Sequence, residues 1–304
     1  MKDLKYFIDN ALKQHFALGA FNFNNMETLQ GIVEACKSTC SPAIISVSEG
    51  AFNYMGDYVL ALANTAKKDF PFLFLHLDHG KCFEICKKAV DLGFDSVMID
   101  GSSLPFDKNV ELTKKVVNYA HSKNILVEGE LGQIKGIEDN VFASSHIYTD
   151  PNQSKEFVEK TNVDLLAVAI GTSHGAYKYS GEQKLRFDIL EEIERLLPSF
   201  PLVLHGASTV EQELVDEFNN FGGELVKANG IPKELLRQAV KQHNIIKINT
   251  DTDIRIAMTS QVRKVLMENK KEFDLRKYLG KGKEKIVEIL ENKIKEVLFS
   301  FDKI

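Results

Sequence analysis

Eight short apolar runs alternate along this chain with stretches of helical periodicity. Runs that are apolar at nearly every position are typical of parallel strands covered on both faces. Regular alternation with helices predicts an α/β protein built on a parallel sheet. The count of eight favours a closed (β/α)8 TIM barrel over a doubly wound sheet. The expected strands are Gly19–Phe23, Ala43–Ser48, Phe72–Leu77, Ser96–Asp100, Ile125–Glu130, Leu165–Ile170, Leu202–Leu204 and Ile245–Asn249.

Amphipathic helices are expected between these runs and at both ends of the chain. Residues 1–14 read as one such helix, and Gly282–Phe299 as an extra C-terminal helix packed on the outside of the barrel. No linker, internal repeat or low-complexity segment interrupts the pattern, so we expect one domain over residues 1–304. The other expected helices include Met26–Thr39, Val110–Ser122, Asp188–Leu197, Val210–Phe221 and Ile254–Asn269.

Two connections are long and polar. Residues 131–150 carry only a weak pattern, and residues 171–184 are rich in Gly and Ser. A loop of about 20 residues inside a compact domain is usually functional. We therefore expect 131–150 to act as a lid.

Charge and cysteine content exclude several classes of function. Lys and Arg number 38 against 43 Asp and Glu, which leaves a net charge of −5 and no basic field for nucleic acid. No apolar run approaches the roughly 20 residues that span a bilayer, and the N-terminal residues lack the apolar core of a signal peptide. These features predict a cytoplasmic protein with neither nucleic-acid nor membrane partners. The cysteine pairs 36/40 and 82/86 lack C-x-x-C spacing and read as buried thiols.

Nearly every expected strand ends in a polar group, and in a barrel these ends meet on one face. Three of these groups are His79, His174 and His205, each next to or near a glycine. Three His ligands leave a fourth zinc position open, which is the pattern of a catalytic site. An isolated His is more often a satisfied core or surface residue, but three at three strand ends predict a metal site. His76 lies within a strand and is expected to be packed or to support the site.

Carboxylates accompany these histidines. Asp78 could orient a metal ligand or act as an acid/base, because strand ends curl and let neighbouring side chains reach one site. Asp100 and Glu130 end the next two strands and could hold a second cation or stay solvated. Glu138 lies in the long loop, where an acidic residue is usually only a surface residue.

Phosphate-binding signals gather at the last strands. Gly175, Gly206 and Ser208 offer backbone and hydroxyl donors at strand ends. The run 249–253 (NTDTD) precedes an expected helix, whose free N–H groups bind anions. Barrels frequently place a phosphate after strands seven and eight, so we favour phosphate over a plain helix cap.

Together these motifs resemble the class II, metal-dependent fructose-1,6-bisphosphate aldolases, in particular the shorter class IIB subgroup. They occur in the family's order and spread over nearly the whole chain, and LDHG, GTSHG, HGAS and NTDTD in succession are highly specific. The matching segments are FNFNN (21–25), SVSEG (46–50), LDHG (77–80), VMIDGS (97–102), EGELG (128–132), GIEDN (136–140), AIGTSHGAYK (169–178), LVLHGAS (202–208) and NTDTD (249–253).

The resemblance implies a carbon–carbon lyase of glycolysis and gluconeogenesis. It would cleave fructose 1,6-bisphosphate reversibly to dihydroxyacetone phosphate and glyceraldehyde 3-phosphate, with tagatose 1,6-bisphosphate as the alternative substrate. Zn²⁺ would polarise the C2 oxygen. Asp78 would act on the C4 hydroxyl, and Glu138 would move the proton at C3 as the long loop closes. A dimer or larger homo-oligomer is expected.

The resemblance also implies a set of binding residues. His79, His174 and His205 would hold the catalytic zinc, and Asp100 and Glu130 a second metal position. Some members also bind Na⁺ or K⁺ near a phosphate. The C1 phosphate would contact Gly175, Gly206, Ser208, Asn249, Asp251 and Thr252. The C6 phosphate would contact Ser48, Lys178 and Arg276, the last from a neighbouring subunit.

Three other functions compete with this interpretation. A Schiff-base aldolase needs a lysine inside the barrel, for which Lys247 is a candidate that leaves the three histidines unexplained. A metal-dependent hydrolase often carries H-x-H on an early strand, which the first expected strand lacks. A sugar-phosphate sensor would not need Asp78 and Glu138 beside a full set of metal ligands.

Overall fold

The computed structural model describes residues 2–134, 136–138, 141–143, 147–173, 175, 184–226 and 228–304, without the side chains of 137, 138 and 141–143. Eight of its strands form a closed parallel barrel in the order β1-β10-β9-β8-β5-β4-β3-β2. This architecture confirms the expected (β/α)8 barrel. The barrel strands are β1 (Leu18–Asn22), β2 (Ala43–Ser48), β3 (Leu73–Gly80), β4 (Ser96–Ile99), β5 (Leu126–Leu131), β8 (Leu165–Val168), β9 (Leu202–Leu204) and β10 (Ile245–Thr250).

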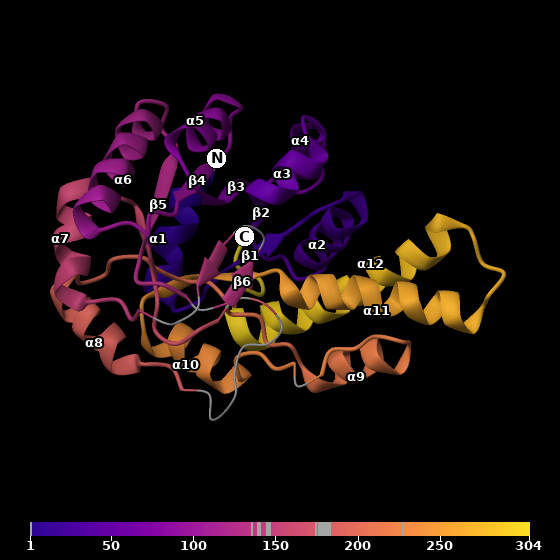
Figure 1. Ribbon diagram of the computed structural model, residues 1–304. Helices are drawn as coiled ribbons and strands as arrows, with labels where there is room; N and C mark the ends of the chain where they lie inside the picture. Colours follow the sequence, from indigo (N-terminus) through magenta and orange to yellow (C-terminus); the bar gives the residue numbers. More distant parts are fainter. Residues whose placement is uncertain are drawn as a thin grey trace.

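Helices surround the barrel, and two of them extend away from it (Figure 1). The long helices α11 and α12 pack against each other, and α12 also packs against α2. The helices are α1 (Leu4–Gln14), α2 (Met26–Ser38), α3 (Glu49–Met55), α4 (Tyr58–Asp69), α5 (Phe83–Asp91), α6 (Phe106–His121), α7 (Pro151–Thr161), α8 (Phe187–Leu196), α9 (Gln212–Asn220), α10 (Lys233–Gln242), α11 (Thr252–Glu268), α12 (Leu275–Lys293) and the π-helix η1 (Ile294–Leu298).

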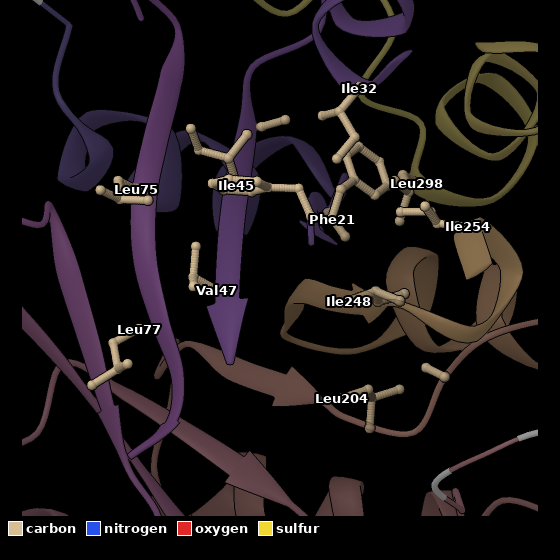
Figure 2. Close-up of a cluster of buried hydrophobic side chains, with 14 of the residues drawn as sticks. Phe21, Ile32, Ile45, Val47, Leu75, Leu77, Leu204, Ile248, Ile254 and Leu298 are labelled. Atoms are coloured by element: carbon tan, nitrogen blue, oxygen red, sulfur yellow. The ribbon is translucent and has the colours of Figure 1, made fainter. Parts of the chain in front are cut away.

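Side chains alternate across each strand between the helices and the barrel interior. Outward residues such as Phe21, Ile45 and Leu75 pack under the helices in the main core (Figure 2). The inward residues Ile44 and Phe74 form a second core, which α1 covers at the N-terminal end of the barrel. Further along the strands the inward residues become polar. The closed apolar end therefore leaves the C-terminal end as the place for chemistry.

The end of the chain packs beside the first strands. The backbone N–H of Ala17, just before β1, donates to the Leu298 carbonyl at 2.8 Å. The N–H of Asp302 donates to Thr39 O at 3.0 Å, and the Ser41 hydroxyl lies 2.8 Å from that of Ser300. Barrel closure by the β1–β10 pair is thus reinforced by the last residues of the chain.

Several details differ from the expectations. The helix expected from Val210 begins at Gln212, because Val210 has a left-handed backbone with φ of +43°. The loop 131–150 contains an antiparallel pair, β6 (Gly136–Glu138) and β7 (Val141–Ala143). The outer C-terminal helix begins at Leu275, seven residues before the expected start. Among the described residues, none of the helices combines the length and hydropathy needed to cross a bilayer.

The prediction of buried thiols is correct for Cys36 and Cys86 and wrong for the other two cysteines. Cys82 is exposed because it precedes α5 as its N-cap residue. Cys40 is partly exposed in a left-handed turn just after α2, so it does not share the buried helix face of Cys36.

Candidate active site

Five buried side chains meet at the C-terminal end of the barrel, and we call them the mouth cluster: Asp78, His79, Asp100, Glu130 and His205. They form two overlapping sets that could hold a cation, one of Asp78, His79 and His205 and the other of His79, Asp100 and Glu130. Within each set the potential ligand atoms lie within 4.8 Å of one another. The sequence-predicted metal and acid/base residues of strands β3, β4, β5 and β9 are therefore brought together.

An irregularity in β3 lets two consecutive residues reach this cluster. The pairing of β3 with β4 shifts between Leu77 and Gly80, and His79 has a left-handed φ of +51°. In a regular strand Asp78 and His79 would point to opposite faces. The shift turns both inward. A methyl group at Gly80 would lie 2.8 Å from the Met98 carbonyl oxygen, so this position accommodates only glycine without movement of the backbone.

Asp78 is held by two side-chain amides, one from β1 and one from β10. Asn22 Nδ2 donates to its Oδ2 at 2.8 Å, and Asn249 Nδ2 donates to its Oδ1 at 3.0 Å. Both contacts are buried. Two donors on two different oxygens fix the plane of the carboxylate, which is what a precisely aimed acid/base requires.

His205 presents one ring nitrogen to the cluster and anchors the other. Its Nε2 lies 2.6 Å from Glu128 Oε1. Its buried Nδ1 has no hydrogen-bond partner among the residues described, and it lies 3.7 Å from Asp78 Oδ1. Burial, together with the nearby His79, lowers the pKa of His205. A neutral ring whose far nitrogen donates to a carboxylate is the usual form of a metal ligand.

His79, Asp100 and Glu130 form the acidic half of the mouth cluster, which holds a proton when no metal ion is bound. Burial opposes the charged form of His79, but its contact with Asp100 at 3.1 Å and the charges of Asp78, Asp100 and Glu130 raise its pKa to about 10. Burial and the neighbouring Asp100 raise the pKa of Glu130 well above its usual range, and its Oε2 has no hydrogen-bond partner among the described residues. Several carboxylates around one histidine therefore fit a cation in place of the proton.

Asp100 is the ionised member of this half. Burial works against its charge, but the His79 contact and Lys81, whose Nζ lies 2.6 Å from Oδ2, hold its pKa well below the usual range. Ser102 donates to the other oxygen at 2.7 Å through its hydroxyl. The residue is thus a fixed anion at the edge of the site.

Deeper in the barrel lies a second set of polar residues, which we call the interior cluster: His76, Ser96, Glu128 and Lys247. Lys247 Nζ donates to Glu128 Oε2 at 2.8 Å and lies 3.4 Å from His76 Nε2, while His76 Nδ1 lies 2.8 Å from Ser96 Oγ. Burial and the Lys247 charge lower the pKa of His76 to about 3, and Lys247 and His205 outweigh burial to lower that of Glu128. The expectation that His76 is packed is correct. Because Lys247 is paired with the buried Glu128 carboxylate, it is poorly suited to form the Schiff base of the competing aldolase mechanism.

The predicted phosphate residues lie in two turns and at one helix start. Gly206 has a φ of +60°, and a methyl group there would lie 2.6 Å from the Ser173 carbonyl oxygen. Gly175 also has a positive φ, of +81°, and Ser208 is buried. Asp251 precedes α11, where Arg255 donates to it at 2.8 Å, and Thr252 is the first residue of that helix. The side chain of Asn249 contacts Asp78, so this residue joins the two parts of the site.

The remaining predicted residues have different positions. Ser48 caps α3, where its hydroxyl accepts from the Ala51 N–H at 3.2 Å. The Arg276 side chain is 89% exposed at the start of α12 and pairs with Asp274. His174 and Lys178 fall outside the described residues. Glu138 lies in β6, but its side chain is not among those described.

Sequence reasoning gave no role to three residues that contact the predicted ones, Asn22, Lys81 and Glu128, and considered Lys247 only as a Schiff-base candidate. Alternation along β5 was a usable signal, because Glu128 and Glu130 are two apart and must share the inward face. The roles of Asn22 and Lys247 depend on contacts across the barrel, which alternation along one strand does not reveal.

Comparisons with known proteins agree with this geometry. The family model described as "Fructose-bisphosphate aldolase class-II" matches residues 2–303. A curated fructose-bisphosphate aldolase of Treponema pallidum is 46% identical, and the match covers 95% of this chain and 93% of the relative. One from Helicobacter pylori is 45% identical over 290 residues, with 94% of each chain covered. The crystal structure of the YdjI aldolase from Escherichia coli K12 is similar with a TM-score of 0.79 and 30% identity, covering 99% of this chain and 98% of that one.

Proposed function

This chain belongs to the class II fructose-bisphosphate aldolase family, and we propose that it cleaves fructose 1,6-bisphosphate reversibly to dihydroxyacetone phosphate and glyceraldehyde 3-phosphate. The family is metal-dependent. The observation that carries the proposal is the mouth cluster, in which two histidines that could hold a metal ion adjoin a carboxylate held by two amides. Curated relatives named for this reaction favour it over cleavage of the tagatose bisphosphate.

We propose that His79, His205 and His174 hold a catalytic Zn²⁺. Two observations support this assignment. The buried Nδ1 of His205 has no hydrogen-bond partner among the described residues and could bind a cation. The carboxylates around His79 raise its pKa, so they favour a positive charge at this place, which a metal ion would supply instead of the proton. Bound zinc would supply Lewis-acid stabilisation of the negative charge that develops on the C2 oxygen of the substrate. Asp100 and Glu130 are proposed as a second divalent position, and a monovalent cation, Na⁺ or K⁺, is proposed beside a phosphate.

Asp78 is proposed to take the proton from the C4 hydroxyl as the C3–C4 bond breaks. The amides of Asn22 and Asn249 orient its two oxygens and keep it an acceptor. Glu138, on the β6–β7 hairpin of the long loop, is proposed to return a proton to C3. Placing the acid and the base on separate elements allows one to stay fixed while the other arrives with the loop.

Two phosphate sites complete the proposal. Gly175, Gly206, Ser208, Asn249, Asp251 and Thr252 are proposed to bind the C1 phosphate through backbone N–H groups and hydroxyls near the start of α11. Ser48 and Lys178 are proposed to meet the C6 phosphate together with Arg276 of a second copy.

The position of Arg276 supports an oligomer. It lies near the turn of the α11–α12 pair, which extends away from the barrel (Figure 1). Large apolar side chains are exposed around that turn, namely Leu266, Met267, Phe273 and Leu275. Such a patch on a soluble protein marks an interaction site. We therefore propose a homodimer or larger oligomer of a cytoplasmic, one-domain enzyme.

Cleavage assays before and after chelation test this function. Fructose and tagatose 1,6-bisphosphates are run in parallel, and triose phosphate is measured as it forms. We expect cleavage of the fructose bisphosphate that is lost with chelator and restored by zinc. Preferential cleavage of the tagatose bisphosphate would correct the substrate. Failure of the zinc-loaded protein to cleave either sugar would overturn the proposal.

A further inference from the structure

A second buried ion pair lies away from the mouth cluster. Asp253, in the first turn of α11, and Lys293, the last residue of α12, are joined by a 3.0 Å contact between Lys293 Nζ and Asp253 Oδ2. Each side chain is only 5% exposed. Burying two charges has a large desolvation cost, which their attraction offsets only when further hydrogen bonds satisfy both groups. The partners of the pair therefore indicate what it does.

Those partners all belong to one loop. Asp253 accepts from the backbone N–H groups of Val210 at 2.8 Å and Thr209 at 3.0 Å, and from the Thr209 hydroxyl at 3.3 Å. Lys293 donates in addition to the Ala207 carbonyl at 3.4 Å. The pair thus holds the backbone of residues 207–210 from both sides of Ser208. Burial opposes the charge of Asp253, yet Lys293 and these N–H groups lower its pKa.

The backbone of residues 206–210 has an unfavourable conformation that other contacts must stabilise. Val210 has a φ of +43°, which is unfavourable for a β-branched side chain, and Gly206 at the other end has a φ of +60°. Its remaining contacts are close: the Ile231 N–H donates to Ser208 O at 3.0 Å, and a methyl group at Gly230 would lie 2.4 Å from the same oxygen. Without Asp253, two N–H groups would lose their acceptor, and Val210 could relax to an ordinary backbone.

We propose that Asp253 and Lys293 are positioning residues that hold the segment 206–210 in the shape that binds a phosphate group of the substrate. The proposal rests on the function proposed above, because Gly206 and Ser208 are assigned there to the C1 phosphate. Both side chains are buried, so we assign neither of them a contact with substrate. They act through the backbone of the loop, so their loss weakens phosphate binding while the mouth cluster stays intact.

Lys293→Met tests the proposal, with Lys67→Met as a matched control. Lys67 also contacts a carboxylate that holds a backbone N–H, since Asp95 accepts from both Lys67 and Leu75, but this pair lies at the N-terminal end of the barrel. We expect Lys293→Met to raise KM for fructose 1,6-bisphosphate about tenfold and to change kcat much less. Calorimetry should show inorganic phosphate binding about tenfold more weakly, with full zinc content. Lys67→Met should lower the Tm without changing either binding value.

Amide hydrogen exchange gives a readout that does not depend on the reaction. The peptide covering 205–214 should exchange faster in Lys293→Met and at the wild-type rate in Lys67→Met. Asp253→Asn should reproduce the effect, and combining it with Lys293→Met should add little, because the pair acts as one unit. Lys293→Gln, which keeps a donor toward Asp253, replaces Lys293→Met if that variant does not fold.

The outcomes separate the two proposals. Unchanged KM, phosphate affinity and exchange in the Lys293 variant, beside a lowered Tm, would overturn the positioning role and leave a purely structural pair. Wild-type protein that binds inorganic phosphate through a protected 205–214 segment but cleaves no sugar would overturn the proposed function instead.

Discussion

The two polar clusters of the barrel both take residues from β3 and β5, and His205 of the mouth cluster contacts Glu128 of the interior cluster, yet their charges are balanced differently. In the interior cluster the Glu128 carboxylate meets the Lys247 ammonium at 2.8 Å. In the mouth cluster the carboxylates of Asp78, Asp100 and Glu130 surround His79, and Lys81 pairs with Asp100. In the interior cluster one carboxylate is matched by one ammonium, whereas the mouth cluster has more carboxylates than lysines, and the pKa values of His79 and Glu130 are raised there.

This difference distinguishes buried polar residues that stabilise the fold from those that can bind a ligand. Buried charges that satisfy one another contribute to the fold and leave nothing to bind. Buried acceptors that lack enough positive charge shift pKa values and attract a proton or a metal ion. His205 joins the two, since Glu128 fixes one ring nitrogen and leaves the other facing the mouth. Substitutions in the mouth cluster should therefore cost activity, and those in the interior cluster should cost stability.

The largest effect is expected from removing a mouth histidine. His79→Ala should lose bound zinc and lower kcat/KM by about 10⁴-fold or more, because the stabilisation of the oxygen charge is lost. Metal content by atomic emission and a triose phosphate assay measure both. His121→Ala, which removes a half-exposed histidine paired with Asp164, is the control and should keep both properties. Full zinc content and activity in His79→Ala would show that the mouth cluster is not the catalytic metal site.

Removing the acid/base should separate chemistry from metal binding. Asp78→Asn should lower kcat by about 10³-fold because it removes the proton acceptor. Zinc content should remain near that of the wild type, since His79 and His205 are intact. Asn22→Ala is the graded control and should lower kcat less, because it removes one of the two amides that orient Asp78. Turnover that survives in Asp78→Asn would reject this residue as the base.

The interior cluster should respond in stability. Lys247→Met leaves Glu128 buried without its cation and should lower the free energy of unfolding by about 3 kcal/mol or more. Urea unfolding of the metal-free protein measures the change. Glu130→Gln in the mouth cluster should change stability by less than about 1 kcal/mol, because Oε2 has no hydrogen-bond partner to lose among the described residues. Equal decreases in the free energy of unfolding of Lys247→Met and Glu130→Gln would contradict the distinction between the clusters.

The smallest effect is expected from pH. His79, with its pKa raised to about 10, carries a proton at neutral pH in the metal-free protein, and a metal ion must displace it. The apparent zinc affinity should therefore rise about tenfold per pH unit up to the pKa of His79. Competition with a chromophoric chelator at pH 7 and pH 8 measures this slope. Asp100→Asn removes a carboxylate that holds the proton, so its slope should be shallower; a wild-type affinity independent of pH would contradict the argument.

The strands were predictable because their signal is local. All eight expected runs are barrel strands, shifted by only a few residues at their ends. The mouth residues of strands β3, β4, β5 and β9 were also predictable, since in a parallel barrel the carboxyl ends of the strands converge. Position along a strand was sufficient information for both.

Partners across the barrel were not predictable in this way. That Asn22 and Asn249 meet at Asp78, or that Lys247 reaches Glu128, depends on the register of strands distant in sequence. The left-handed Val210 was missed for a related reason, because its backbone N–H donates to Asp253, which is distant in sequence. A valine viewed alone favours the opposite conformation.

The junction between the two ends of the chain also has a consequence for how the protein is made. The first barrel strand is completed by the β1–β10 pair, and Ala17 and Thr39 bind backbone groups of Leu298 and Asp302. During synthesis the early βα units emerge from the ribosome long before these partners exist. Until β10 is available, the edge of β1 stays unpaired and can pair with another chain. The barrel can close only after β10 has emerged, and the contacts with Leu298 and Asp302 form later still, so this topology keeps the edge of β1 exposed during most of synthesis.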